Sequence, residues 1–223
     1  MTHADGRAPR RVPGAAFGLL ALTDAALAGA PPRIRRLRLL TKPLLMPALL
    51  TRSLPAPADH PLATAQAFSW GGDLALLGKG RTSFLAGVGL FLGAHVAYLS
   101  AFRARSSAPV LATPGRRRFL AFGGLAAAGM TLAAAREDRV LAAPIAAYAG
   151  ALATMVAAAA AIDRDRGRDR VLVGAALFLV SDTVLGVRTF LVGEESPASA
   201  ALEATVIATY TAAQWSIAEG LRR

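Results

Sequence analysis

Long apolar stretches, separated by short charged or proline-containing connections, follow one another along almost the whole chain. They lie at residues 12–30, 36–51, 62–78, 82–102, 118–135, 140–161, 171–192 and 199–220. Most have the roughly 20 residues that an α-helix needs to cross a hydrocarbon core about 30 Å thick. The pattern therefore predicts an all-α, polytopic membrane bundle of about eight transmembrane helices, forming a single membrane domain over residues 12–220.

The second stretch differs from the others because its apolar part is short. Residues 39–50 include Pro43 and Pro47 and reach only about 18 Å at 1.5 Å per residue. Proline inside a helix removes a backbone hydrogen bond and bends the helix. We therefore expect this segment to be kinked or partly re-entrant. In the fourth stretch, Gly89 and Gly93 have the G-x-x-x-G spacing that permits close helix packing, and we interpret them as packing residues.

Composition agrees with a membrane protein. The chain has 223 residues, of which 54% are hydrophobic and only 17% charged, and its mean hydropathy is +0.45. Soluble domains carry about 25% charged residues. The net charge of +11 comes largely from arginine clusters in the connections, with no interleaved aromatic residues to stack on bases. We expect these arginines to set topology and contact anionic lipid headgroups, and we expect no nucleic-acid partner.

The distribution of basic residues also predicts orientation. Lys and Arg are more frequent at the two termini and in every second connection than in the remaining connections, which places both termini in the cytoplasm. Residues 1–11 are then a basic cytoplasmic tail. The abundance of Ala and Arg is typical of a GC-rich bacterial genome, so we expect the bacterial inner membrane. The chain has no cysteine, which excludes disulfides and thiol catalysis, and its three histidines do not cluster as zinc ligands.

Two aspartates, Asp73 and Asp182, interrupt stretches that are otherwise apolar. A carboxylate near the centre of a bilayer costs roughly 2.5–3.5 kcal/mol on insertion scales, so such residues usually face the bundle interior and mark function. Other polar residues share helical faces with them or with one another at i, i+3 or i, i+4 spacing. We expect these residues to face one cavity, with the candidate site made of Asp73, Asp182, Lys42, His95, Tyr98, Ser181, Tyr210 and Gln214.

Four further polar residues have simpler interpretations. We expect Tyr148 to be a packing or interface aromatic. We expect Arg188 and Glu203 to pair with each other or to reach headgroups, and Asp24 to meet water or a basic neighbour. Lys42 lies close to the end of its stretch, and its alternative is to extend towards the interface. His95 has the alternative of a buried neutral imidazole that bonds a carbonyl.

Five segments in order carry a family resemblance. They are 41–47 (TKPLLMP), 71–77 (GGDLALL), 91–98 (FLGAHVAY), 174–182 (GAALFLVSD) and 210–214 (YTAAQ). In these segments the chain resembles the YhhN-type lysoplasmalogenase family of bacterial and animal membrane proteins. The resemblance extends over about residues 36–220. It implies an eight-helix membrane hydrolase that cleaves the vinyl ether bond of lysoplasmalogens into a fatty aldehyde and a glycerophospho-ethanolamine or -choline.

The resemblance also implies which positions recur in the family. They are the positions of Lys42, Asp73, His95, Asp182, Tyr210 and Gln214. The expected partners are a lysophospholipid substrate and membrane lipids. Neither a metal nor an organic cofactor is required for the reaction that the resemblance implies.

The chemistry of a vinyl ether suits two carboxyl groups. Protonation of its β-carbon gives an oxocarbenium ion, water adds, and the hemiacetal collapses to an aldehyde and an alcohol. A low-dielectric cavity can keep one carboxyl group protonated near neutral pH while a second stays ionised. Glycosidases divide the work in the same way around an oxocarbenium-like transition state. Asp73 and Asp182 are our candidates for the two catalytic groups, and the residues alone do not say which is the acid.

Two functions of other classes remain open. Intramembrane aspartates with a lysine, a histidine and tyrosines also serve proton- or ion-coupled transporters. The sequence has no obvious duplicated half or pair of matching broken helices, which are common in transporters. A non-catalytic lipid-binding or scaffold protein is the third interpretation, although buried polar residues would be an unnecessary cost for it.

Overall fold

The chain is helical throughout the parts that the computed structural model describes, which are residues 12–53, 60–193 and 196–222. The predicted N-terminal tail, residues 1–11, lies outside them. The α-helices are α1 (Val12–Ala28), α2 (Pro32–Arg35), α3 (Arg38–Ser53), α4 (His60–Ala75), α5 (Gly80–Arg103), α6 (Pro114–Glu137), α7 (Ala142–Ala159), α8 (Arg168–Val187) and α9 (Ser199–Leu221). Short turns of other helix types are η2 (Arg139–Leu141), η3 (Arg164–Arg166) and the π-helical η4 (Arg188–Val192). The all-α prediction is confirmed.

The predicted number of membrane spans is wrong. Within the described residues, four helical segments are long and apolar enough to cross a membrane, namely Gly80–Arg103, Pro114–Glu137, Arg139–Ala159 and Arg168–Val192. A shorter apolar helix covers Gly14–Ala28. Several long apolar helices of this kind are those of an integral membrane protein, but they do not amount to eight spans.

Length and polarity explain the difference. Helices α3 and α4 have 16 residues each, or about 24 Å, which is less than the hydrocarbon thickness. Both prolines expected to disturb the second stretch lie inside α3. Helix α9 is long enough at 23 residues, but Glu203, Gln214 and Glu219 interrupt its apolar character.

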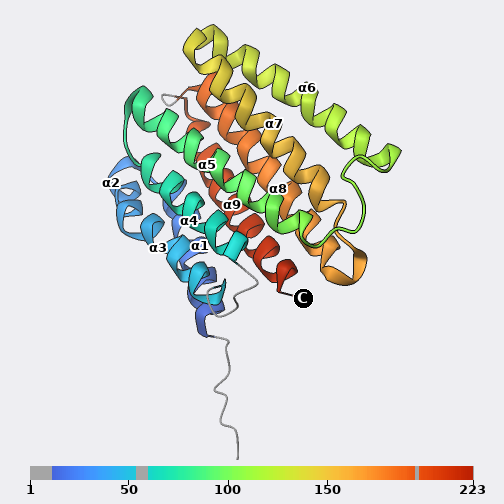
Figure 1. The fold of residues 1–223 in the computed structure, drawn as a ribbon. Helices are drawn as coiled ribbons and strands as arrows, with labels where there is room; N and C mark the ends of the chain where they lie inside the picture. Colours follow the sequence, from blue (N-terminus) through green and yellow to red (C-terminus); the bar gives the residue numbers. More distant parts are fainter. Residues whose placement is uncertain (1–11, 54–59, 194–195, 223) are drawn as a thin grey trace, which may run out of the picture.

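The helices pack largely as neighbouring pairs. The most extensive contacts join α8 to α9, α4 to α5 and α6 to α7, while α1 packs on α3 and α9. Figure 1 shows α9 (red) inside the bundle and α6 (yellow-green) along its outer side, next to α7. The central core is aromatic where α5, α8 and α9 meet, since the rings of Phe91, Phe178 and Tyr210 contact one another edge to face.

Two glycines allow a close contact between α8 and α9. A Cβ on Gly174 would lie 2.9 Å from the backbone nitrogen of Ile217, and one on Gly220 would lie 2.9 Å from that of Val171. Only glycine permits such an approach of one backbone to another. Of the G-x-x-x-G step on α5, only Gly93 is a packing residue: a Cβ there would lie 3.0 Å from the Phe68 ring, whereas nothing lies within 4 Å of a Cβ at Gly89.

Candidate functional site

The first polar cluster surrounds Asp73 on α4 and is called here the Asp73 cluster. Its members are Lys42 from α3, Asp73, and Tyr210 from α9. The Tyr210 hydroxyl donates a hydrogen bond of 2.8 Å to Oδ2 of Asp73, and Nζ of Lys42 lies 3.7 Å from Oδ1. All three residues are buried. Helix α4 brings Asp73 to this position because Gly72 has no side chain, and a Cβ there would lie 2.6 Å from the Phe91 ring.

A second set of hydrogen bonds lies one turn away and is called here the Gln214 network. Its members are Ser69 on α4, Tyr98 on α5 and Gln214 on α9. The Gln214 side-chain amide donates to the Ser69 hydroxyl at 3.0 Å, and its carbonyl accepts from the Tyr98 hydroxyl. Gln66 is also fully buried on α4, and its side-chain amide has no hydrogen-bond partner among the described residues. The network fixes α9 against α4 and α5 beside Asp73.

The third group surrounds Asp182 on α8 and is called here the Asp182 cluster. Its members are His95 from α5, Tyr148 from α7, and Asp182. The Tyr148 hydroxyl donates a hydrogen bond of 2.5 Å to Oδ2 of Asp182, and Nε2 of His95 lies 3.8 Å from the same oxygen. His95 is 0% exposed, and neither ring nitrogen has a hydrogen-bond partner in the described structure. The imidazole ring rests against the rings of Tyr148 and Phe178.

Ser181 holds α8 against α9. Its hydroxyl donates to the backbone carbonyl of Val206 on α9 at 3.1 Å. Successive helical side chains are about 100° apart around the axis, so the next residue, Asp182, faces α7 instead of α9. Ser181 therefore positions α8 and does not join either aspartate cluster.

Aromatic rings lie between the two aspartate clusters. The Phe178 ring centroid is 5.6 Å from that of Tyr210 on one side and 5.1 Å from that of His95 on the other. Each aspartate consequently has its own partners, and no hydrogen bond or ion pair joins the two carboxyl groups in the described part of the chain. The sequence predicted one shared cavity, whereas the structure divides the candidate residues between separate groups.

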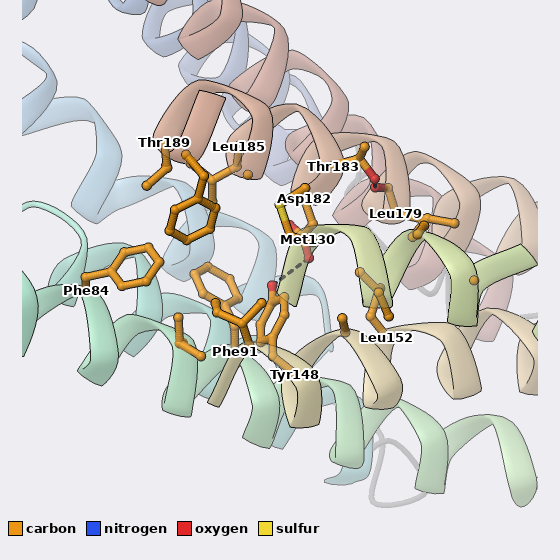
Figure 2. Close-up of a pocket in the computed structure, with 18 of the residues that line it drawn as sticks. Phe84, Phe91, Met130, Tyr148, Leu152, Leu179, Asp182, Thr183, Leu185 and Thr189 are labelled. Atoms are coloured by element: carbon orange, nitrogen blue, oxygen red, sulfur yellow. Dashed lines mark hydrogen bonds between the residues drawn. The ribbon is translucent and has the colours of Figure 1, made fainter. Parts of the chain in front are cut away.

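An apolar pocket of about 90 Å³ adjoins only one of the aspartates (Figure 2). Side chains of α5, α6, α7, α8 and η4 line it, and its polar groups are the Asp182 carboxyl, the Tyr148 hydroxyl and two threonines, Thr183 and Thr189. Figure 2 shows the Tyr148–Asp182 hydrogen bond at the pocket wall, with Phe84, Phe91 and Met130 nearby. Asp73 does not line this pocket.

A buried ion network lies near the Asp73 cluster. Arg38 on α3 contacts Asp24 on α1 at 3.3 Å and Glu203 on α9 at 2.7 Å, and Arg188 on η4 contacts Glu203 at 3.2 Å. The predicted pairing of Arg188 with Glu203 and the predicted basic neighbour of Asp24 are both confirmed. Buried charges of this kind are normally paired, and here they connect α1, α3, α9 and η4.

Tyr148 is the site residue whose role the sequence did not reveal. The sequence predicts a packing or interface aromatic, but the Tyr148 hydroxyl donates a hydrogen bond to Asp182. The available signal was a single hydroxyl-bearing aromatic in an otherwise apolar, alanine-rich helix. Such a hydroxyl normally needs a hydrogen-bond partner when it is buried.

In the described residues, no group of three His, Asp or Glu side chains is arranged to hold a metal ion.

Comparison with known families covers most of this chain. Residues 37–221 match the YhhN family. This matched region includes every residue of the Asp73 cluster, the Gln214 network and the Asp182 cluster. The chain belongs to the YhhN family. No curated protein and no solved structure matched. The part of this YhhN-family protein that lies before the matched region includes α1 and Asp24.

Proposed function

We propose that this YhhN-family protein is a membrane-embedded ether hydrolase that cleaves the vinyl ether bond of lysoplasmalogens, giving a fatty aldehyde and a glycerophospho-ethanolamine or -choline. The observation that carries the proposal is the Asp182 carboxyl at the wall of an apolar pocket, with Tyr148 bonded to one of its oxygens. A proton donor beside a water-poor space large enough for apolar groups suits the protonation of an alkene carbon. Family membership supports the same reaction through the resemblance described above.

In this mechanism Asp182 is the acid. Tyr148 occupies Oδ2, which leaves Oδ1 to carry the proton. Transfer of that proton to the β-carbon gives an oxocarbenium ion beside the newly formed Asp182 carboxylate, which stabilises it. Water then adds to the cation and loses a proton to Asp182, so the acid is restored. In the hemiacetal, the hydroxyl proton passes to the glycerol oxygen as the carbon–oxygen bond breaks, which releases the aldehyde and the alcohol.

His95 and Asp73 have separate roles in the proposal. Nε2 of His95 lies 3.8 Å from Oδ2 of Asp182, and because His95 is fully buried and does not line the pocket, its role is to position the Asp182 carboxyl group. Asp73, with Lys42 and Tyr210 as partners, suits the ionised state of a counter-anion on the other side of the aromatic rings. Tyr98 and Gln214 hold α9 in place, and Tyr210 with it.

The separation of the clusters favours hydrolysis over transport. A proton- or ion-coupled transporter needs polar groups or water along the route, whereas the Phe178 ring lies between Tyr210 and His95. Two local sites, one of them beside a pocket, therefore support chemistry at a fixed place. We propose further that the protein lies in the bacterial inner membrane with both termini cytoplasmic, in contact with anionic lipids through its arginine-rich connections.

The test is hydrolysis by the purified protein in detergent. A lysoplasmalogen and its ester analogue, with the same chain and headgroup, are compared for release of fatty aldehyde. We expect aldehyde from the vinyl ether and no cleavage of the ester. Asp182→Asn should lower the rate by at least about 100-fold, the scale of a lost acid–base group. Asp73→Asn removes only the proposed counter-anion, which does not line the pocket, and should lower the rate by less. Full activity in the Asp182→Asn variant would refute the proposed acid.

A further inference from the structure

The charge of the pocket beside Asp182 limits what part of a lipid it can hold. As the described residues define it, the lining contains one carboxyl group, that of Asp182, and no Lys, Arg or His. Its other polar atoms are hydroxyls of Tyr148, Thr183 and Thr189, and the remainder is aliphatic or aromatic. Such a lining accommodates a hydrocarbon chain and an ether oxygen, because neither of these brings a charge that needs a partner.

Three cations of the surrounding segments have anionic partners elsewhere. Lys42 contacts Asp73 beyond the Phe178 ring, Arg188 contacts Glu203, and Arg81 contacts Asp138 at 2.9 Å. A phosphate drawn into the pocket would therefore be buried close to the Asp182 carboxyl without a positive neighbour in the lining. Burial of an unpaired anion is strongly unfavourable, and a like charge nearby makes it more so.

The side of the pocket at Thr183 and Ala126 offers a way out for the rest of the lipid. Both residues line the pocket, and both are exposed on the surface of the bundle, on α8 and α6 respectively. Another part of the lining belongs to the small hydrophobic cluster of Val88, Ala134, Leu141 and Ile145, against which Phe84 and Phe190 pack. We therefore take the Thr183–Ala126 side as the mouth of the pocket.

We infer that the site recognises the apolar chain and the enol ether and leaves the headgroup outside, so that an uncharged 1-alkenylglycerol is cleaved as well as a lysoplasmalogen. This inference rests on the proposed function and adds a neutral class of substrate to it. The reaction remains balanced without a co-reactant other than water. Water adds to the protonated enol ether, the carbon–oxygen bond breaks, and the products are a fatty aldehyde and free glycerol, with no net oxidation or reduction.

The direct test compares kcat/KM for two substrates with the same alkenyl chain, 1-alkenylglycerol and 1-alkenylglycerophosphocholine, at equal surface concentration in mixed micelles. We expect the two values to agree within about threefold, since the headgroup makes no contact that changes the barrier. A preference of more than about tenfold for the phosphate-bearing substrate would show a contact with the headgroup and overturn the inference.

A cationic side chain at the mouth of the pocket should create a preference for the phosphate-bearing substrate. In Thr183→Arg, kcat/KM for the phosphocholine substrate relative to the neutral one should rise by about fivefold or more, because a guanidinium pairs well with phosphate. Thr183→Gln is the matched control, with a long polar side chain but no charge, and should leave the ratio unchanged. An unaltered ratio in Thr183→Arg would show that the headgroup does not pass Thr183.

Binding separates failure of this inference from failure of the proposed function. The saturated ethers 1-O-alkylglycerol and 1-O-alkylglycerophosphocholine cannot be cleaved through an enol ether, and each should raise the Tm of the detergent-solubilised protein to a similar extent. Ala149→Phe, which fills the pocket, should remove both shifts. No aldehyde from any substrate would refute the hydrolase alone. A Tm shift that appears only with the phosphocholine compound would refute the neutral pocket.

Discussion

The Tyr148 hydroxyl donates a hydrogen bond of 2.5 Å to Oδ2 of Asp182 and so connects α7 to α8 at the pocket wall. One carboxyl oxygen is thereby fixed, and the other is left for chemistry. The bond also sets the direction of the carboxyl group, because both partners lie on helices that contact each other directly. Tyr148 acts through Asp182 and is a positioning residue in the proposed reaction.

Removal of this hydroxyl should slow the reaction without unfolding the protein. We expect Tyr148→Phe to lower kcat by roughly 10- to 100-fold, since a hydrogen bond to a charged group contributes about 1.5–3 kcal/mol. The KM should change little if the tyrosine only orients the acid. Aldehyde release measures both constants, and the pH profile of kcat should shift because the partner of the acid is gone.

A second hydroxyl on the same helix supplies the control for Tyr148→Phe. Thr154 donates to the carbonyl of Gly150, one turn earlier in α7, and does not line the pocket. Thr154→Val should therefore leave kcat and its pH profile unchanged. An equal loss of activity in both variants would mean that α7 is simply sensitive to substitution.

The Lys42–Asp73 ion pair should be important for stability because both side chains are buried. Lys42→Met leaves the Asp73 carboxyl without its cation, and we expect the free energy of unfolding to fall by about 3–5 kcal/mol. The double variant Lys42→Met/Asp73→Leu should recover part of this loss, since no unpaired charge remains. Unfolding in mixed micelles of SDS and a mild detergent measures the change. Arg81→Met breaks the exposed pair with Asp138 and should have a much smaller effect.

Because α8 and α9 are in close contact, we expect two Gly→Ala substitutions to change the free energy of unfolding in different directions. Gly174→Ala should destabilise the protein by about 1–3 kcal/mol, because the added Cβ would meet backbone atoms of α9 that cannot move aside. Gly150→Ala on α7 has open space around its Cβ and should be neutral or stabilising by up to about 1 kcal/mol. Equal effects of the two substitutions would contradict the close approach.

The stability of the protein should depend on pH through Asp163, which lies in the connection after α7. Hydrogen bonds from the Ser107 hydroxyl at 2.8 Å and from the Ser107 amide hold the pKa of the Asp163 carboxyl below its ordinary value. A depressed folded-state pKa contributes stability at pH values above the unfolded pKa of about 3.9, and this contribution is lost as the pH falls through the folded value.

Asp163→Asn is the test of this linkage. At neutral pH the variant should have a lower Tm than the parent protein, because the amide accepts the two Ser107 bonds less strongly. The difference should narrow once the pH falls below about 4, where the carboxyl group becomes protonated in the parent protein too. A difference that is constant from pH 7 to pH 3 would contradict the role of the carboxylate.

The sequence by itself determined the all-α fold class and the family, and it singled out two aspartates as candidate site residues. Apolar stretches of helical length required an all-α membrane protein, and Asp73 and Asp182 were evident because a carboxyl group in such a stretch is costly and needs a partner. Hydropathy overestimated the number of spans, since it does not show where a helix such as α4 begins and ends. The sequence also predicted the pairing of Arg188 with Glu203, because opposite charges at the ends of neighbouring apolar stretches attract each other.

Only the tertiary structure decided how the polar residues are grouped. Helix α8 meets α7 with one face and α9 with another. These faces depend on the rotation of α8 about its axis and on the close approach at Gly174, and helical spacing within one segment fixes neither of them. That packing placed Phe178 between the aspartates, gave Tyr148 to Asp182 and Lys42 to Asp73, and opened the pocket beside one of them. Contacts between distant segments arise from side-chain shape and burial across the whole bundle.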